Sequence, residues 1–198
     1  MQKINIIQHR ALLVEKSKTD LDDYFTFTVS EPVMDLTGTP YGGARFSVEA
    51  KIDGKIFSKF TLDVGIGDVW LESDVINLKN YMPETLNPGS AKVISIEQHC
   101  AEKIHAYTLP RENFNSRVKD LVDLYLIFKF EKVNKENFKD TLTKTFKRRN
   151  THPKPTVLPN PHELWKDRFE RILKDFEAEK DIDSAFNLVN NFYQEIIT

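Results

Sequence analysis

The segment at residues 116–127, "SRVKDLVDLYLI", combines four charged side chains with many apolar ones. Arg117 and Asp120 are three positions apart, and Lys119 and Asp123 are four apart. Side chains at both spacings meet on a helix surface, so each pair has a simple interpretation as a local ion pair. The surrounding apolar residues nevertheless leave little exposed helix surface, and buried charges are usually paired or functional. The sequence leaves both interpretations open.

A second group of reactive side chains lies in "IEQHCAEKIHAYTL", whose apolar residues recur at helical spacing. Lys103 has Cys100 and Tyr107 as helix neighbours, which places it at the edge of the apolar face. From there its ammonium group can reach a phosphate, although a solvent-exposed lysine with a packed stem is the simpler interpretation. His99 and His105 are six positions apart and do not share a helix face, which disfavours a metal pair.

Carboxylates at strand ends are the third candidate. Asp63 follows an apolar run and precedes Gly65 and Gly67, an arrangement that suits a metal ligand but also an ordinary turn. Two acidic doublets have the Asp-x-Asp spacing that places two carboxylates on one face of a strand. The doublet at 19–23 leads into a strand, where a polar segment before the strand is a simpler interpretation than a metal site. The doublet at 181–184 precedes a helix and is interpreted as its cap.

The elements that would position these residues are strands followed by helices. Residues 24–29 and 44–52 alternate in the period-2 pattern of strands, and Asp53-Gly54 predicts a tight hairpin turn into a third strand that ends near Asp63. This gives an antiparallel meander after a helical N-terminus. The remaining predicted elements are a short strand at 92–96, helices from 96 and 116, an amphipathic helix at 134–150, a proline-rich joint at 151–163 and two further helices. The fold class is α+β.

Composition limits the function classes. The 198 residues are 40% apolar and carry a net charge of −2, so no global basic field drives the chain onto nucleic acid, although a local basic patch is compatible with it. The single cysteine, Cys100, excludes an internal disulfide framework. No apolar run approaches the roughly 20 residues of a membrane span, and the apolar stretch within the first ten residues is too short for a signal peptide. We expect a cytoplasmic protein with no membrane partner.

Four stretches, "FTLDVGIGD", "ISIEQHCAEKIHAY", "SRVKDLVDL" and "TFKRRNTHP", together resemble the AbiEii/AbiGii nucleotidyltransferase toxin family of type IV toxin–antitoxin and phage-defence systems. Their order and approximate spacing match over nearly the whole chain, and "LWKDRFERI" is similar as well. The combination of "AEKIHA" with "SRVKDLVDL" is fairly specific to this family.

The resemblance implies a polymerase-β-like nucleotidyltransferase fold and Mg²⁺-dependent transfer of a nucleotide from an NTP to an acceptor, which in some relatives is tRNA. By position, Asp63 matches the third carboxylate of the central sheet and is the expected metal ligand. Lys103 matches the lysine that meets the triphosphate, and Asp120 matches the motif that closes the site. The other expected nucleotide-binding residues are Arg117, Lys119 and Asp123. A cognate antitoxin protein is a further expected partner.

One departure from the family pattern is serious. The family opens with Gly-Ser followed by Asp-x-Asp on a strand, and this sequence lacks that signature because its first glycine is Gly38. We therefore expect a nucleotidyltransferase-like domain at 1–130 without its N-terminal portion, and a helical region at 131–198. With one of three carboxylates, the chain is expected to hold Mg²⁺ weakly and to be inactive on its own. Asp20 and Asp22 would replace the lost pair only if the strand order changed.

Two rival hypotheses come from other classes. A non-catalytic remnant would bind a protein or nucleic acid through the retained helices. A helical interaction module would use its charges only as ion pairs, and it predicts that Lys103, Asp63 and Asp120 lie far apart.

Overall fold

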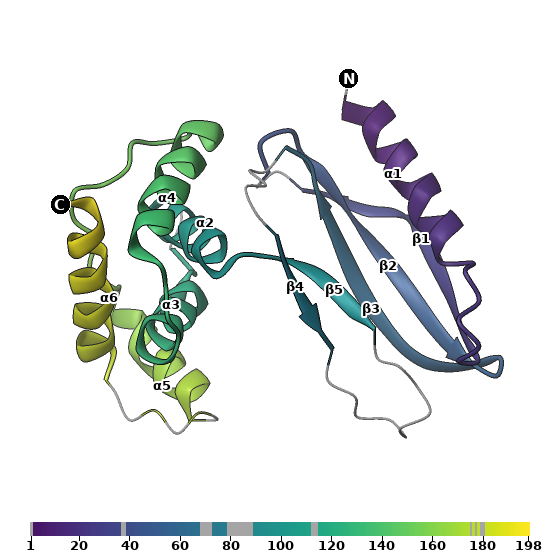
Figure 1. The fold of residues 1–198 in the computed structure, drawn as a ribbon. Coiled ribbons are helices and arrows are strands. Elements are labelled where there is room, and N and C mark those ends of the chain that lie inside the picture. Colours follow the sequence, from purple (N-terminus) through teal and green to yellow (C-terminus); the bar gives the residue numbers. More distant parts are fainter. Residues whose placement is uncertain are drawn as a thin grey trace. The chain divides into compact units, whose positions relative to one another are not determined.

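A computed structural model describes most of the chain: residues 2–36, 39–67, 73–78, 89–111, 115–174, 176, 178 and 181–198. Within these ranges the elements follow one another as strands between helices (Figure 1). In chain order they are α1 (Gln2–Lys16), β1 (Phe25–Asp35), β2 (Gly43–Ile52), β3 (Lys55–Gly65), β4 (Ser73–Asn77), β5 (Ser90–Ile94), α2 (Ile96–Thr108), α3 (Val118–Phe130), α4 (Lys135–Arg149), the 3₁₀ turn η1 (Glu163–Trp165), α5 (Lys166–Leu173) and α6 (Ile182–Ile197). The α+β class predicted from the sequence is confirmed.

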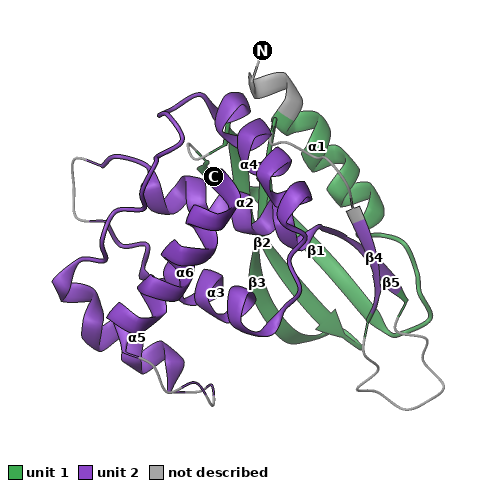
Figure 2. Ribbon diagram, turned by 60° about the vertical axis from the view of Figure 1, so that its left-hand side comes forward, with its two compact units in different colours: residues 1–68, 78–89 green, residues 69–77, 90–198 purple. Residues whose placement is uncertain are grey.

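The chain divides into two compact units, coloured separately in Figure 2. Unit 1 comprises residues 1–68 and 78–89, and unit 2 comprises residues 69–77 and 90–198. These packing units do not follow the predicted division at residue 130, because α2 and α3 share one core with α4 to α6. The functional domains at 1–130 and 131–198 stay a prediction.

Unit 1 is built on the predicted antiparallel meander, with strand order β1-β2-β3. Asp53 and Gly54 both have positive φ, 45° and 73°, as a two-residue hairpin turn of the primed type requires. On β2 every second residue is buried, namely Ala44, Phe46, Val48 and Ala50. The alternation therefore defines the inner face of the sheet, as its period predicted. Helix α1 lies along this sheet beside β1 (Figure 1), where Arg10 donates a hydrogen bond to the Ser30 carbonyl.

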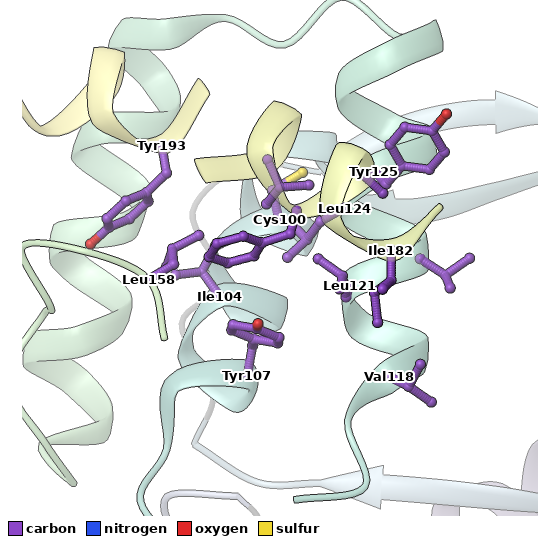
Figure 3. Close-up of a cluster of buried hydrophobic side chains, with 14 of the residues drawn as sticks. Cys100, Ile104, Tyr107, Val118, Leu121, Leu124, Tyr125, Leu158, Ile182 and Tyr193 are labelled. Atoms are coloured by element: carbon purple, nitrogen blue, oxygen red, sulfur yellow. The ribbon is translucent and has the colours of Figure 1, made fainter. Parts of the chain in front are cut away.

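Unit 2 contains the antiparallel pair β4–β5 and a helical core formed by α2 to α6. Figure 3 shows part of this core, in which the inward faces of α2 and α3 meet side chains of α6 and of the proline-rich segment. That segment is irregular, as predicted, but two buried tyrosines hold it. The hydroxyl of Tyr107 donates to the carbonyl of Pro159 over 2.8 Å, and that of Tyr193 donates to Pro155 over 2.5 Å. Leu158 from the same segment is buried in the core.

Three of the described helices begin at capping side chains. Ser95 caps α2, Asn134 caps α4, and Asp181 caps α6 through hydrogen bonds from Asp183 and Ser184. The interpretation of 181–184 as a helix cap is thereby confirmed.

Candidate active site

Helix α2 positions Lys103 by burying the residues on either side of it. Cys100, Ile104 and Tyr107 are almost fully buried and fix the rotation of the helix. Lys103 lies at the edge of this face, as its spacing predicted, and its side chain is only 15% exposed. A lysine this enclosed needs a partner, because an unpaired buried ammonium group is strongly disfavoured.

Helix α3 supplies two carboxylates to Lys103. Its Nζ lies 3.4 Å from Asp120 Oδ1 and also donates a hydrogen bond to Asp123 Oδ2. Asp120 and Asp123 are one helical turn apart and therefore face the same neighbour. Asp120 is as enclosed as the lysine, at 12% exposure, whereas Asp123 is 44% exposed. The ammonium group is held between an inner and an outer carboxylate.

The inner carboxylate is incompletely satisfied. Asp120 Oδ2 is buried, and no hydrogen-bond partner for it lies among the residues that the structure describes. The guanidinium of Arg117 is 3.6 Å away, within ion-pairing range but too far for a hydrogen bond. Buried acceptors without a partner are rare and call for an explanation, such as a catalytic role or a bound ion or water. Asp120 therefore retains capacity to interact with a further cation or donor.

The local ion pairs predicted for α3 are partly correct. Arg117 and Asp120 form the expected i,i+3 pair. Asp123, however, pairs with Lys103 of α2, while Lys119 is exposed to solvent. A partner from another helix replaces the local one because the apolar residues of α3 turn Asp123 toward α2. Three of the four charges, those of Arg117, Asp120 and Asp123, therefore belong to one cluster centred on Lys103.

The sequence assigns no site role to two residues of this cluster, Arg111 and His99, and it weighs His99 only as half of a metal pair. His99 lies one turn before Lys103, and burial lowers its pKa, with a further lowering by the charge of Lys103 and opposing effects of Asp123 and Asp120. Burial also lowers the pKa of Arg111, as does the charge of Arg117. The i,i+4 spacing of His99 and Lys103 was a usable signal. Nothing in the sequence pointed to Arg111.

Asp63 lies in unit 1, near the end of β3. Both of its carboxylate oxygens accept hydrogen bonds from Arg45 of β2, each over 2.6 Å, and this contact lowers the Asp63 pKa. The neighbouring Gly67 does not leave space for a ligand. It has φ +90°, and a Cβ there would lie 2.2 Å from the ring of Tyr41. Asp63 and Lys103 belong to different units, so their convergence stays a prediction.

Asp20 and Asp22 lie at the other end of the sheet from Asp63. Strand β1 begins at Phe25, which pairs with Ile52 of β2, and Ile52 in turn pairs with Lys55 at the start of β3. Asp63 pairs with Arg45 near the opposite end of β3. The eight positions from Lys55 to Asp63 span roughly 26 Å along a strand. Asp20 instead closes a local turn by accepting a hydrogen bond from the Asp22 amide. These two aspartates therefore do not join Asp63 as a substitute for the missing pair.

The described carboxylates do not by themselves fit a Mg²⁺ site. In the part of the chain that the structure describes, no group of three or more His, Cys, Asp or Glu side chains could hold a metal ion. Arg45 engages both oxygens of Asp63, and Lys103 engages one oxygen of Asp120 and one of Asp123. Mg²⁺ prefers several oxygen ligands in near-octahedral geometry, which a single carboxylate does not supply.

The cluster thus consists of a largely enclosed lysine between two aspartates of a neighbouring helix, with Arg117 beside the inner one. A family model described as nucleotidyl transferase AbiEii toxin, type IV TA system, matches residues 7–189. The chain therefore belongs to the AbiEii nucleotidyltransferase toxin family. No curated protein matches the sequence significantly.

Membership of a type IV toxin–antitoxin family implies an antitoxin as partner. Among the described helices, none has the length and apolar character needed to cross a membrane.

Proposed function

We propose that the chain provides the triphosphate-binding part of a nucleotidyltransferase, which transfers a nucleotide from an NTP to an acceptor such as tRNA with Mg²⁺. The observation that carries this proposal is Lys103, enclosed by Asp120 and Asp123 in a chain of the AbiEii family. Phosphoryl-transfer enzymes work mainly by positioning the phosphates and by placing cations against their charge. A preorganised lysine of this kind meets that requirement.

The cluster suggests a specific role for each side chain. Asp120 positions Lys103, because it is enclosed and its contact does not compete with solvent. Asp123 is the exchangeable partner, since it is more exposed and a phosphate oxygen can replace it at the ammonium group. Arg117 and the exposed Lys119 add positive charge near the bound triphosphate, and Asp120 Oδ2 accepts from a donor that arrives with the substrate.

Nucleotide binding tests this part of the proposal directly. Lys103→Gln should weaken the binding of an NTP by about tenfold or more, because one charge-assisted contact to phosphate contributes roughly 1.5–3 kcal/mol. Lys139→Gln on the exposed face of α4 is the matched control and should leave binding unchanged. Isothermal titration calorimetry gives both dissociation constants. Equal binding by the wild-type chain and Lys103→Gln would contradict the assigned role of Lys103.

The second part of the proposal concerns Mg²⁺ binding and the transferase activity that depends on it. The sequence carries one of the three expected sheet carboxylates, Asp63, and Arg45 engages both of its oxygens. We therefore propose weak Mg²⁺ binding and little transferase activity for these 198 residues alone. Radiolabelled NTP incubated with total tRNA and Mg²⁺ should give little or no labelled product. Robust labelling that Asp63→Ala abolishes would show that the site is complete and would contradict the proposed inactivity.

The alternative prediction is a non-catalytic module that binds a protein or nucleic acid through the same helices. It differs from the proposal in one measurable respect, because it requires no nucleotide at Lys103. Specific NTP binding that depends on Lys103 would favour the nucleotidyltransferase, and its absence in a folded chain would favour the module.

A further inference from the structure

The segment at 141–162 is strongly basic within an acidic chain. It contains five lysine and arginine residues and no aspartate or glutamate, whereas the whole chain has a net charge of −2. The segment covers most of α4 and the loop after it, on which the stretch "TFKRRNTHP" lies. The nucleotidyltransferase site described above uses none of these residues, so their charge needs a separate account.

An open pocket of about 440 Å³ lies where α4 ends. Its walls are Phe146 and Lys147 of the helix and the loop residues from Asn150 to Lys154. Asn150 has the left-handed conformation, with φ 46°, and ends the helix so that the loop turns back beside it. We call this cavity the Lys147–Lys154 pocket.

A hydrogen-bond network between α2 and the loop holds the pocket wall. Thr151 Oγ1 lies 2.9 Å from His105 Nε2 and 3.0 Å from His152 Nδ1, and Thr108 Oγ1 lies 2.9 Å from His152 Nε2. Burial, followed by the charges of His152 and Arg149, lowers the pKa of His105 to about 4. The imidazole of His105 is therefore neutral near pH 7 and acts as a structural contact. The loop is fixed in place before any ligand arrives.

The cations of the segment differ in whether a carboxylate neutralises them. Lys144 pairs with Asp140 over 2.6 Å, and Arg149 pairs with Glu102 over 2.5 Å. For Lys147 and Lys154, by contrast, no ion pair is found with any residue that the structure describes. A lysine in the last turn of a helix also stabilises the helix dipole, which accounts for Lys147 but not for Lys154 in the loop.

We propose that the Lys147–Lys154 pocket binds a backbone phosphate of a polynucleotide strand. Two lysines, for which no carboxylate partner is found among the described residues, supply the charge, and the Asn150 side chain supplies a hydrogen-bond donor. The pocket is open, which suits a phosphate that is part of a longer chain. This inference rests on the proposed function and extends it, because it gives the acceptor a binding site separate from the one at Lys103.

The two sites lie on different sides of the same helix. Lys103 and His105 are two positions apart on α2, a rotation of about 200° around the helix axis. Lys103 faces α3, whereas His105 contacts the loop that forms the pocket. The Lys147–Lys154 pocket therefore holds the strand at a distance from the transferred nucleotide, and its loss weakens strand binding without removing Lys103 from the triphosphate.

The test is the binding of a fluorescent single-stranded RNA oligonucleotide, followed by anisotropy over a range of salt concentrations. The double variant Lys147→Gln/Lys154→Gln should bind about tenfold more weakly than wild type. Its plot of log K against log salt should be less steep by roughly 1.4, since each lost contact to a single strand contributes about 0.7. Both side chains lie at the surface of the pocket, so circular dichroism should show an unchanged fold.

Three comparisons make the result decisive. Lys144→Gln removes the same charge one turn away and should bind RNA as wild type does, because Asp140 already neutralises Lys144. Lys103→Gln should also bind RNA normally. Loss of NTP binding at Lys103 can therefore be distinguished from loss of RNA binding at the Lys147–Lys154 pocket. Inorganic phosphate should compete only at much higher concentration than the oligonucleotide.

Equal affinity and salt dependence for wild type and the double variant would overturn the proposal, as would an equal effect of Lys144→Gln. Competition by inorganic phosphate at the concentration of the oligonucleotide would also overturn it, because the pocket would then hold a free anion.

Discussion

Lys103 and Asp120 form an enclosed pair, and its disruption should cost measurable stability. Lys103→Met keeps most of the apolar stem but removes the ammonium group. Asp120, at 12% exposure, would then keep only Arg117 at 3.6 Å, and its Oδ1 would lose the contact at 3.4 Å. Breaking a fully buried pair costs about 3–5 kcal/mol, and losing one hydrogen bond to a charged group costs about 1.5–3 kcal/mol. Since Arg117 compensates in part, we expect a loss of about 2 kcal/mol in unfolding free energy.

Urea unfolding followed by far-UV circular dichroism measures this loss. The urea midpoint should fall while the m-value, the slope of unfolding free energy against urea concentration, stays constant, because the fold itself is unchanged. The double variant Lys103→Met/Asp120→Leu removes both charges and should recover much of the lost stability, giving a coupling free energy of about 1–2 kcal/mol. Lys144→Met breaks the exposed pair with Asp140 and serves as the control, with an expected loss below about 0.5 kcal/mol.

Two results would refute this reasoning. If Lys103→Met cost no more than Lys144→Met, Lys103 would be an ordinary surface lysine. If the effects of the Lys103 and Asp120 substitutions on unfolding free energy were additive, the two side chains would not interact across the helices. The positioning role proposed for Asp120 would then be wrong.

Three further predictions concern the core and the proline-rich segment. Tyr193→Phe removes the hydrogen bond to Pro155 and should cost about 1 kcal/mol by urea unfolding, and no change would mean that this bond does not hold the segment. Leu121→Ala opens the fully buried core of unit 2 and should cost about 2–5 kcal/mol, and a loss below 1 kcal/mol would contradict its burial. The pKa of His105 is lowered to about 4, so the folded state favours the neutral imidazole. The stability that this preference contributes is therefore complete above about pH 6.5, the ordinary histidine pKa. It should be lost as the pH falls toward 4, and His105→Gln should reduce this dependence in urea midpoints measured at several pH values.

Local sequence patterns predicted the elements well where one face of each element is buried. The period-2 alternation of β2 and the positive-φ residues Asp53 and Gly54 led to the correct hairpin. Helices α2, α3, α4 and α6 also lie where apolar spacing indicated them. The short strand expected at 92–96 is instead β5 at Ser90–Ile94, because α2 begins at Ile96 directly after its Ser95 cap. Of the helix expected after residue 163, the structure describes α5 over Lys166–Leu173, and residues 175, 177, 179 and 180 lie outside the described part.

The candidate site was predicted less evenly. Lys103 was recognised by its position at the edge of an apolar helix face and by the family resemblance, and the same resemblance pointed to Asp120. Spacing along α3 offers Lys119 as a possible partner of Asp123, whereas the structure pairs Asp123 with Lys103 of α2, because spacing along one helix identifies only local pairs. His99 joins the cluster as the i−4 neighbour of Lys103 on α2, a spacing that the sequence shows, whereas Arg111 joins it only through tertiary structure. The prolines of the loop after α4 indicate an irregular joint, but they do not indicate the pocket that the loop forms with Lys147.

The sequence by itself determined the order of strands and helices and the identity of the residues that resemble the AbiEii family. Those features depend on local periodicity, on turn chemistry and on motifs that stand in the chain as written. Only the tertiary structure decided which charges meet. Lys103 pairs with Asp120 and Asp123 because burial of the apolar faces of α2 and α3 brings these side chains together where solvent screens them little. Asp123 therefore pairs with a lysine twenty positions earlier in the chain, and not with Lys119, its neighbour on the same helix.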